Sequence, residues 1–284
     1  MSRRMSTAVV TALVLALTMA TPAGAAPPPG LGPVGKSVAL GSSFAAGPGI
    51  PPRQPGSPAG CGRSRNNYAS VVARHDELDL HDVSCSGADT NNILTAPQGG
   101  RPPQIRAVTR DTALVTITIG GNDVEYLGSL TAYSCQNSQG KNCAAVDQNR
   151  INRELRSVAS SIGKVVDAVH RRAPDARVLL VNYLTILPLT GPVCDGVPLT
   201  DDQVWFERLV ASRLEAATDE AARRHDARVV NAATASRQHH ACSSDPWVER
   251  YRTQPGRTPY HPNKTGMSKV ASLVEATIDA GHGR

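Results

Sequence analysis

Apolar residues along the chain form two kinds of segment. The first kind is a short, nearly unbroken apolar run rich in β-branched residues, which is typical of a strand buried on both faces of a sheet. The clearest example is Ala113–Ile119, which stops at Gly120-Gly121. The same pattern predicts strands at Val34–Leu40, Arg177–Leu184 and Ala227–Val230, with an extended stretch around Leu78–Ser84.

The second kind of segment has apolar residues three or four positions apart, as on one face of a helix. Between 146 and 172 this spacing links Ile151, Leu155, Val158 and Ile162, and Pro174 then ends the helical pattern. Capping residues and helical spacing together predict helices at Tyr68–Arg74, Val146–Arg172, Asp201–His225 and Lys264–Ala280, with Thr200 or Asp201 as the N-cap of the third.

Buried strands that alternate with long helices indicate a parallel sheet covered on both faces. We therefore predict an α/β protein, a three-layer α/β/α sandwich with a central parallel sheet. No internal repeat or linker divides the segment 34–284, so a single domain is expected there. In such sheets ligands bind beyond the carboxyl ends of the strands, so catalytic residues should follow strands directly.

The N-terminal segment predicts export. Arg3-Arg4 precede the apolar run Ala8–Ala20, and Ala23-Gly24-Ala25 follows it. A basic start, a short apolar middle and an A-x-A ending are typical of a secretory signal peptide, here 1–26. Residues 27–33 would then form a Pro/Gly-rich leader. An uncleaved anchor is the alternative, but the apolar run is short for a membrane span.

Composition narrows the range of partners. The 284 residues carry a formal net charge of +6, and 40% of them are hydrophobic. Because no run of Lys and Arg forms a basic stripe, a nucleic-acid partner is not expected. No later segment is apolar enough to predict stable membrane insertion, and we expect a soluble, secreted monomer.

Six cysteines lie outside the signal segment: Cys61, Cys85, Cys135, Cys143, Cys194 and Cys242. An even number in an exported chain predicts three disulfides, although the count alone leaves their connectivity open. A zinc site is the alternative reading. The sequence has no Cys-x-x-Cys pair and its histidines are scattered, so disulfides are favoured and no metal is expected.

Three polar segments lie at positions where a parallel sheet is expected to carry catalytic residues. Gly41-Ser42-Ser43 follows the first predicted strand and Gly120-Gly121-Asn122-Asp123 follows the strand at 113–119. His261-Pro262 precedes the last predicted helix. Each segment alone is as well explained by an ordinary turn or helix cap. Their order along the chain is the informative feature.

That order resembles the SGNH (GDSL-type) hydrolase family, whose four sequence blocks carry Ser, Gly, Asn and His. Gly41-Ser42-Ser43 is similar to the Gly-Asp-Ser block, and Ser84–Ala88 to the second block. Gly120–Asp123 and His261-Pro262 match the third and fourth blocks. The resemblance runs from about Val34 to the end and implies the flavodoxin-like SGNH fold.

The resemblance also implies roles for individual residues. Ser43 would be the nucleophile and His261 the base that accepts its proton. The oxyanion would be held by the backbone N–H groups of Ser43 and Gly87 and by the side-chain amide of Asn122. No metal or organic cofactor is implied.

The cysteine spacing resembles that of secreted bacterial lipases and phospholipases A1 of this family. This likeness implies the sequential pairs Cys61–Cys85, Cys135–Cys143 and Cys194–Cys242. The first pair would join the loop after Ser43 to the loop that carries Gly87. The other two would tighten the loop after Asn122 and the segment that leads to His261.

Two positions depart from the family pattern. Ser42 replaces the usual Asp beside the nucleophile, which puts the hydrogen bonding of that loop in question. Thr258 stands where the family usually has the third acid of the triad. We expect a Ser43–His261 dyad whose imidazole is oriented by a backbone carbonyl near Thr258. Asp245 or Glu249 could supply a carboxylate instead.

The sequence thus predicts an exported serine ester hydrolase that acts on lipid or other acyl esters. Esterase, lipase and phospholipase A1 are the activities that the family resemblance leaves open. A carbohydrate acetylesterase is one alternative, because such enzymes use the same chemistry. A non-catalytic binding protein on the same scaffold is the other, and the missing acid is the argument for it.

Overall fold

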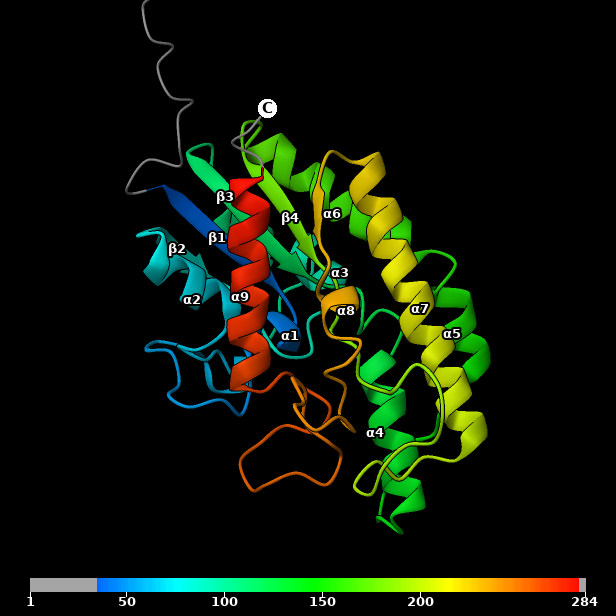
Figure 1. Cartoon of the computed structure of the whole chain (residues 1–284). Helices are drawn as coiled ribbons and strands as arrows, with labels where there is room; N and C mark the ends of the chain where they lie inside the picture. Colours follow the sequence, from blue (N-terminus) through cyan, green and yellow to red (C-terminus); the bar gives the residue numbers. More distant parts are fainter. Residues whose placement is uncertain (1–34, 281–284) are drawn as a thin grey trace, which may run out of the picture. The chain divides into compact units, whose positions relative to one another are not determined.

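A computed structural model describes residues 35–280. Within this range the chain forms one five-stranded parallel sheet in the order β2-β1-β3-β4-β5 (Figure 1). The strands are β1 (Lys36–Gly41), β2 (Asp79–Asp82), β3 (Thr112–Thr118), β4 (Arg177–Val181) and β5 (Arg228–Val230). This order is that of a flavodoxin-like doubly wound sheet, the fold that the family resemblance implies, and the parallel pairing is the one that the alternating pattern predicts.

Helices pack on both faces of the sheet. They are α1 (Ser43–Ala46), α2 (Tyr68–His75), α3 (Thr90–Leu94), α4 (Tyr126–Asn137), α5 (Gln148–Glu154), α6 (Val158–Arg172), α7 (Asp201–Arg224), α8 (Ala232–Ala235) and α9 (Lys264–Asp279). Short 3₁₀ turns occupy Ala59–Cys61 and Gln104–Ala107. Helix α2 packs against α9, and α6 packs against α7 (Figure 1). The three-layer α/β/α prediction is confirmed.

The central strands are buried because they are covered on both sides. In β3, Leu114, Val115 and Ile117 each expose 2% or less of their surface. Val178, Leu179 and Leu180 of β4 are buried in the same way. A central strand surrounded by other elements cannot leave one face in water, so its sequence has no polar alternation.

The helix predicted from 146 to 172 is two helices in the structure, which corrects the expectation. Helix α5 ends at Glu154 and α6 begins at Val158, with a turn between them. Ile151, Leu155 and Val158 are all buried across this break. The apolar spacing therefore continues through the turn, and neither Gly nor Pro marks it.

Helix α4 has no counterpart among the predicted elements. It begins after Glu125, whose φ of 53° is left-handed and whose side chain makes no capping hydrogen bond. Small and aromatic residues are mixed along it, and most of its positions are buried. An amphipathic stripe and a capping residue are the two sequence signals for a helix start, and α4 lacks both.

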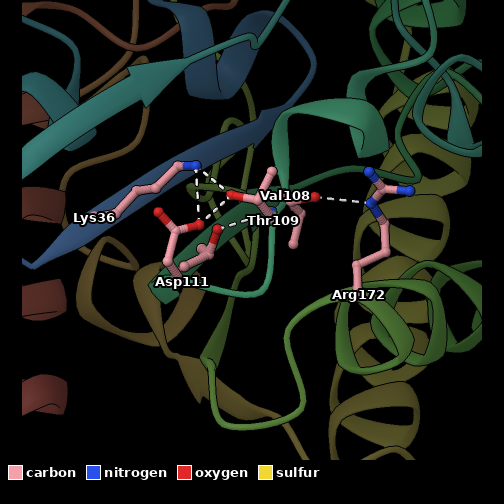
Figure 2. Close-up of polar contacts among 6 residues, drawn as sticks. Lys36, Val108, Thr109, Asp111 and Arg172 are labelled. Atoms are coloured by element: carbon pink, nitrogen blue, oxygen red, sulfur yellow. Dashed lines mark hydrogen bonds and ion pairs between the residues drawn. The ribbon is translucent and has the colours of Figure 1, made fainter.

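Polar contacts fix the chain at the edge of the sheet opposite the strand ends that carry the candidate site. The Lys36 ammonium on β1 meets the side chains of Thr109 and Asp111, and the Thr109 N–H donates to Thr112 Oγ1 over 3.0 Å (Figure 2). From α6, Arg172 Nε donates to the Val108 carbonyl over 2.8 Å. These contacts hold the turn into β3 against its neighbours.

Over residues 35–280, no helix is long and apolar enough to cross a membrane. In the same part of the chain, no cluster of three or more His, Cys, Asp or Glu side chains is placed to hold a metal ion. The predicted signal peptide 1–26 and leader 27–33 lie outside the described residues.

Candidate active site

The carboxyl ends of β1, β2 and β3 carry the residues singled out in the sequence. Ser43 follows β1, Gly87 follows β2 and Asn122 follows β3. These three residues and His261 line one cleft of about 690 Å³. The parallel sheet brings them together because its strands all end at the same edge.

Ser43 is the first residue of the short helix α1, directly after a sharp turn. Gly41 ends β1 at a φ of 131°, and a Cβ at this position would overlap the Thr118 carbonyl of the neighbouring strand. Only glycine fits both the backbone angle and the close approach. The turn leaves Ser43 largely buried, with 7% of its surface exposed.

The hydroxyl of Ser43 and the imidazole of His261 are in direct contact. Ser43 Oγ lies 2.7 Å from His261 Nε2. The other ring nitrogen, His261 Nδ1, lies 2.7 Å from the Pro259 carbonyl oxygen. A carbonyl can only accept a hydrogen bond, so Nδ1 carries the proton and Nε2 offers its lone pair to Ser43.

The carbonyl that faces Nδ1 is that of Pro259 and not that of Thr258, which corrects the expectation by one residue. The Thr258 carbonyl instead accepts the backbone N–H of His261 over 3.3 Å. Tyr260, between them, has a left-handed φ of 60°. This turn directs the Pro259 carbonyl at the ring.

Neither of the two carboxylates considered from the sequence contacts the imidazole. Asp245 pairs with His239 at 3.2 Å. Glu249 Oε2 accepts a hydrogen bond from Thr253 Oγ1 over 2.8 Å. Glu249 reaches His261 only through its backbone N–H, which donates to the His261 carbonyl.

Burial lowers the pKa of His261 from its ordinary value, and the hydrogen bond to Pro259 opposes this effect. The ring of Phe44, the residue after Ser43, lies 5.4 Å from the imidazole between centroids. An apolar neighbour disfavours the charged form of histidine. His261 is therefore neutral over a wider pH range than a solvated histidine.

The loops after β2 and β3 are tied to each other. Asn122 Nδ2 donates to the Ala88 carbonyl over 2.7 Å. Asp123 accepts the Thr90 N–H and is bonded to the Thr90 hydroxyl as well. Gly87, with a φ of 80°, lies at an exposed turn directly before Ala88. Asn122 keeps a second amide hydrogen for another acceptor, because its Nδ2 carries two.

Two further residues support the nucleophile loop, and neither stands out in the sequence. The Gln104 side chain accepts from Gly41 N and donates to the Gly41 carbonyl, over 2.8 and 3.0 Å. The Tyr183 hydroxyl accepts the Gly121 N–H over 2.9 Å and lies 3.3 Å from Ser42 Oγ. Tyr183 thus gives Ser42 a partner in place of the contacts that an Asp would make.

All six cysteines are paired, in the sequential order implied by the family resemblance: Cys61–Cys85, Cys135–Cys143 and Cys194–Cys242. The first bond joins the turn at Gly62 to the loop that carries Gly87. Cys135 and Cys143 themselves line the cleft. Two of the three bonds therefore border the candidate site.

The fold and the site describe an α/β protein with a Ser–His pair at the carboxyl edge of its sheet. Residues 39–269 match the model of the GDSL-like lipase/acylhydrolase family. A lipase of Streptomyces coelicolor, Lipase 2, is 35% identical over 290 residues, covering 98% of this chain and 96% of the relative. The chain belongs to this family of carboxylic ester hydrolases.

Solved structures show the same fold. An extracellular lipase from Streptomyces rimosus is similar with a TM-score of 0.69 and 28% identity, over 85% of this chain and 98% of the other. A phospholipase A1 from Streptomyces albidoflavus has a TM-score of 0.68 and 24% identity, over the same shares.

Proposed function

We propose that the protein is a secreted esterase or lipase that hydrolyses lipid and other uncharged acyl esters with a Ser43–His261 dyad. The observation that carries the proposal is the pair of contacts of His261, with Ser43 Oγ and the Pro259 carbonyl each at 2.7 Å. Together they supply a nucleophile, a base and a group that holds the base in the required tautomer.

The dyad would act in two steps. His261 Nε2 takes the proton of Ser43 as Oγ attacks the ester carbonyl, and then gives that proton to the departing alcohol. Water enters next and loses a proton to Nε2 as its oxygen attacks the acyl carbonyl. Nε2 then returns that proton to Ser43 Oγ as the acid leaves. The Pro259 carbonyl stabilises the positive imidazole as a dipole rather than as a full charge.

Three donors would hold the negative oxygen of the intermediate: the N–H groups of Ser43 and Gly87 and the free amide hydrogen of Asn122. Asn122 and Gly87 are aligned by the Asn122–Ala88 bond and by the contact between Asp123 and Thr90. One donor of this kind typically contributes about 3–4 kcal/mol to transition-state stabilisation.

The cleft supports an uncharged acyl substrate. Among the described residues, no Asp, Glu, Lys or Arg lines it, and its apolar wall includes Leu127, Ala132 and Ala144. None of the lining residues of this part of the chain is Phe, Tyr or Trp. Sugar sites commonly use aromatic platforms, so the lining favours acyl chains over polysaccharide esters.

Export is supported by three disulfides, which persist in oxidising compartments. The similar Streptomyces rimosus structure is described as an extracellular lipase. The signal-like segment at the N-terminus agrees with both observations.

The test is hydrolysis of p-nitrophenyl esters from acetate to palmitate by the oxidised protein. Ser43→Ala should lower kcat at least about 10⁴-fold, because it removes the nucleophile. Ser42→Ala is the matched control: its hydroxyl faces Tyr183, so it should lose less than about 10-fold.

The acyl-chain length that is hydrolysed fastest distinguishes an acyl esterase from a carbohydrate acetylesterase. An optimum at butyrate or longer supports the acyl esterase, and phospholipids are then the next substrates to try. Activity on acetate alone would point to a carbohydrate acetylesterase. If the protein and Ser43→Ala are equally inactive on every ester, the dyad proposal is wrong and the non-catalytic binding protein becomes the favoured alternative.

A further inference from the structure

The turn that presents a carbonyl to His261 has a backbone conformation that its sequence does not favour. Tyr260, between Pro259 and His261, has a left-handed φ of 60°. In the part of the chain that the structure describes, six residues other than glycine have a positive φ, and Tyr260 is the only buried one. A bulky residue adopts this conformation only where surrounding contacts impose it.

The Tyr260 side chain is anchored to helix α4. It has no exposed surface, and its Oη lies 2.6 Å from Oγ of Ser134, which is equally buried. Burial raises the pKa of Tyr260, with the Ser134 hydrogen bond opposing, so the hydroxyl stays protonated at neutral pH. The contact is therefore a neutral hydrogen bond in a place that water does not reach, where such bonds are strongest.

The loop before Tyr260 has no other buried anchor. Residues 249–259 are all exposed or only partly buried, so Tyr260 is the first fully buried residue of this segment. Pro259 has no N–H with which to bind a neighbour, and its carbonyl oxygen faces His261 Nδ1. After the turn, the His261 carbonyl accepts the Glu249 N–H over 2.8 Å. The placement of the Pro259 carbonyl thus depends on the side chain that follows it.

We propose that Tyr260 is a positioning residue whose hydrogen bond with Ser134 holds the Pro259 carbonyl against His261 Nδ1. This role rests on the proposed Ser43–His261 dyad. Tyr260 does not line the cleft and acts only through the carbonyl before it. The carbonyl keeps the proton on Nδ1 and stabilises the imidazole when Nε2 becomes protonated.

Loss of the anchor has a defined consequence for the imidazole. The hydrogen bond to Pro259 raises the pKa of His261 against the larger, lowering effect of burial. No charged side chain is among the described residues that line the cleft around the ring. A carbonyl that moves away therefore lowers the pKa of His261 further. It also permits the tautomer with the proton on Nε2, which cannot accept the proton of Ser43.

The first experiment measures kcat, KM and their pH dependence on p-nitrophenyl butyrate. Tyr260→Phe and Ser134→Ala break the contact from its two sides. Tyr133→Phe is the matched control, because Tyr133 is also a buried tyrosine of α4 but its hydroxyl accepts from Gln148 Nε2 over 2.8 Å. Far-UV circular dichroism and Tm establish that each variant is folded at the assay temperature.

Tyr260→Phe and Ser134→Ala should each lower kcat at least ~10-fold with KM within ~2-fold, because a hydrogen bond to a charged group is weakened in the transition state. The midpoint of the pH profile should move to lower pH. The double variant should lose no more than either single one, since both act through one contact. Tyr133→Phe should change neither quantity. An unchanged kcat, a loss without a lower midpoint, or an equal loss in Tyr133→Phe overturns the proposal.

A second experiment tests the positioning role separately from the proposed function. In histidine-labelled Ser43→Ala protein, ¹⁵N NMR reports which ring nitrogen of His261 carries the proton, and His261→Gln assigns the signals. The Nδ1–H form should dominate and should lose population when Tyr260→Phe is added, but not with Tyr133→Phe. An unchanged tautomer in Tyr260→Phe overturns the proposal. If the unmodified protein hydrolyses no ester, the proposed function fails, while this measurement still decides the role of Tyr260.

Discussion

The proton on His261 is positioned by a single backbone carbonyl. In the proposed dyad the ring can accept a proton from Ser43 only when Nε2 is unprotonated, so the proposed mechanism requires neutral His261. Burial beside Phe44 lowers its pKa from the ordinary value of 6.5, with the Pro259 hydrogen bond opposing. The catalytic form therefore persists to lower pH than for a solvated histidine.

The expected pH dependence of the activity follows from the lowered pKa of His261. We expect kcat/KM for p-nitrophenyl butyrate to rise with pH through a single ionisation whose apparent pKa lies below 6.5, and then to level off near neutral pH. Initial rates in constant-ionic-strength buffers would measure it. An apparent pKa above 7 would contradict a base held neutral by burial.

A second prediction at the residue scale concerns the side chains near His261, because neither Asp245 nor Glu249 contacts the imidazole. Glu249→Gln and Thr258→Ala should each leave kcat within about 10-fold, because neither side chain contacts the imidazole. Loss of a true triad acid lowers kcat by about 10⁴-fold. A loss above about 10²-fold for Glu249→Gln would identify that residue as the missing acid. The same loss for Thr258→Ala would show that the Thr258 side chain is needed to hold the turn that places the Pro259 carbonyl against His261.

At the scale of elements, the interface between α4 and α7 contains an unpaired acid. Glu207 on α7 has no exposed surface, and neither of its carboxyl oxygens has a hydrogen-bond partner. Burial raises its pKa to about 8 from 4.5, and the nearby Ser129 hydroxyl of α4, which donates to the Tyr126 carbonyl, opposes this shift only in part. Helix α4 also supplies Leu127 and Ala132 to the catalytic cleft, so this acid lies behind one of the cleft walls.

Because the folded pKa exceeds the unfolded one, Glu207 lowers stability progressively as the pH rises from about 4.5 to about 8. The full penalty is up to about 5 kcal/mol above that range. Glu207→Gln should therefore raise Tm relative to the unmodified protein, by more at pH 9 than at pH 5. Thermal unfolding at both pH values measures this difference.

Glu220→Gln is the control for that comparison, since Glu220 lies on the same helix but pairs with Arg224 at the surface. It should change Tm little at either pH. If the gain from Glu207→Gln is the same at pH 5 and pH 9, the carboxyl of Glu207 does not titrate in this range.

At the scale of the molecule, the sheet and the site depend on different bonds. Backbone pairing and apolar burial hold the sheet, whereas, within residues 35–280, no disulfide joins two of its strands. Each disulfide typically contributes about 2–4 kcal/mol, largely through the unfolded chain. In this molecule Cys61–Cys85 and Cys135–Cys143 also hold segments that border the cleft.

Reduction should thus remove activity before it unfolds the sheet. With increasing reductant, p-nitrophenyl ester hydrolysis is expected to fall while the far-UV circular dichroism persists. Cys61→Ser with Cys85→Ser should reproduce the loss, because this pair fixes the loop of Gly87. Simultaneous loss of both signals would show that the disulfides are needed for the fold itself.

The sequence alone was sufficient to predict the parallel sheet and the order in which the candidate catalytic residues follow one another along the chain. Unbroken β-branched runs are produced only by burial on two faces, so they identified the central strands within two or three residues. The segments around Ser43, Gly87, Asn122 and His261 were recognisable because their order along the chain resembles the four blocks of the SGNH family. Local pattern could not reveal the break between α5 and α6, because burial continues across it.

Tertiary structure decided which partners these residues have. The contact of His261 with Ser43, the contact of Ser42 with Tyr183 and the two hydrogen bonds between Gly41 and Gln104 join residues that the local sequence pattern does not connect. Such contacts depend on distances of a few ångströms between elements, which no local pattern encodes. Composition and periodicity determine where strands and helices form; packing determines which atoms meet at their ends.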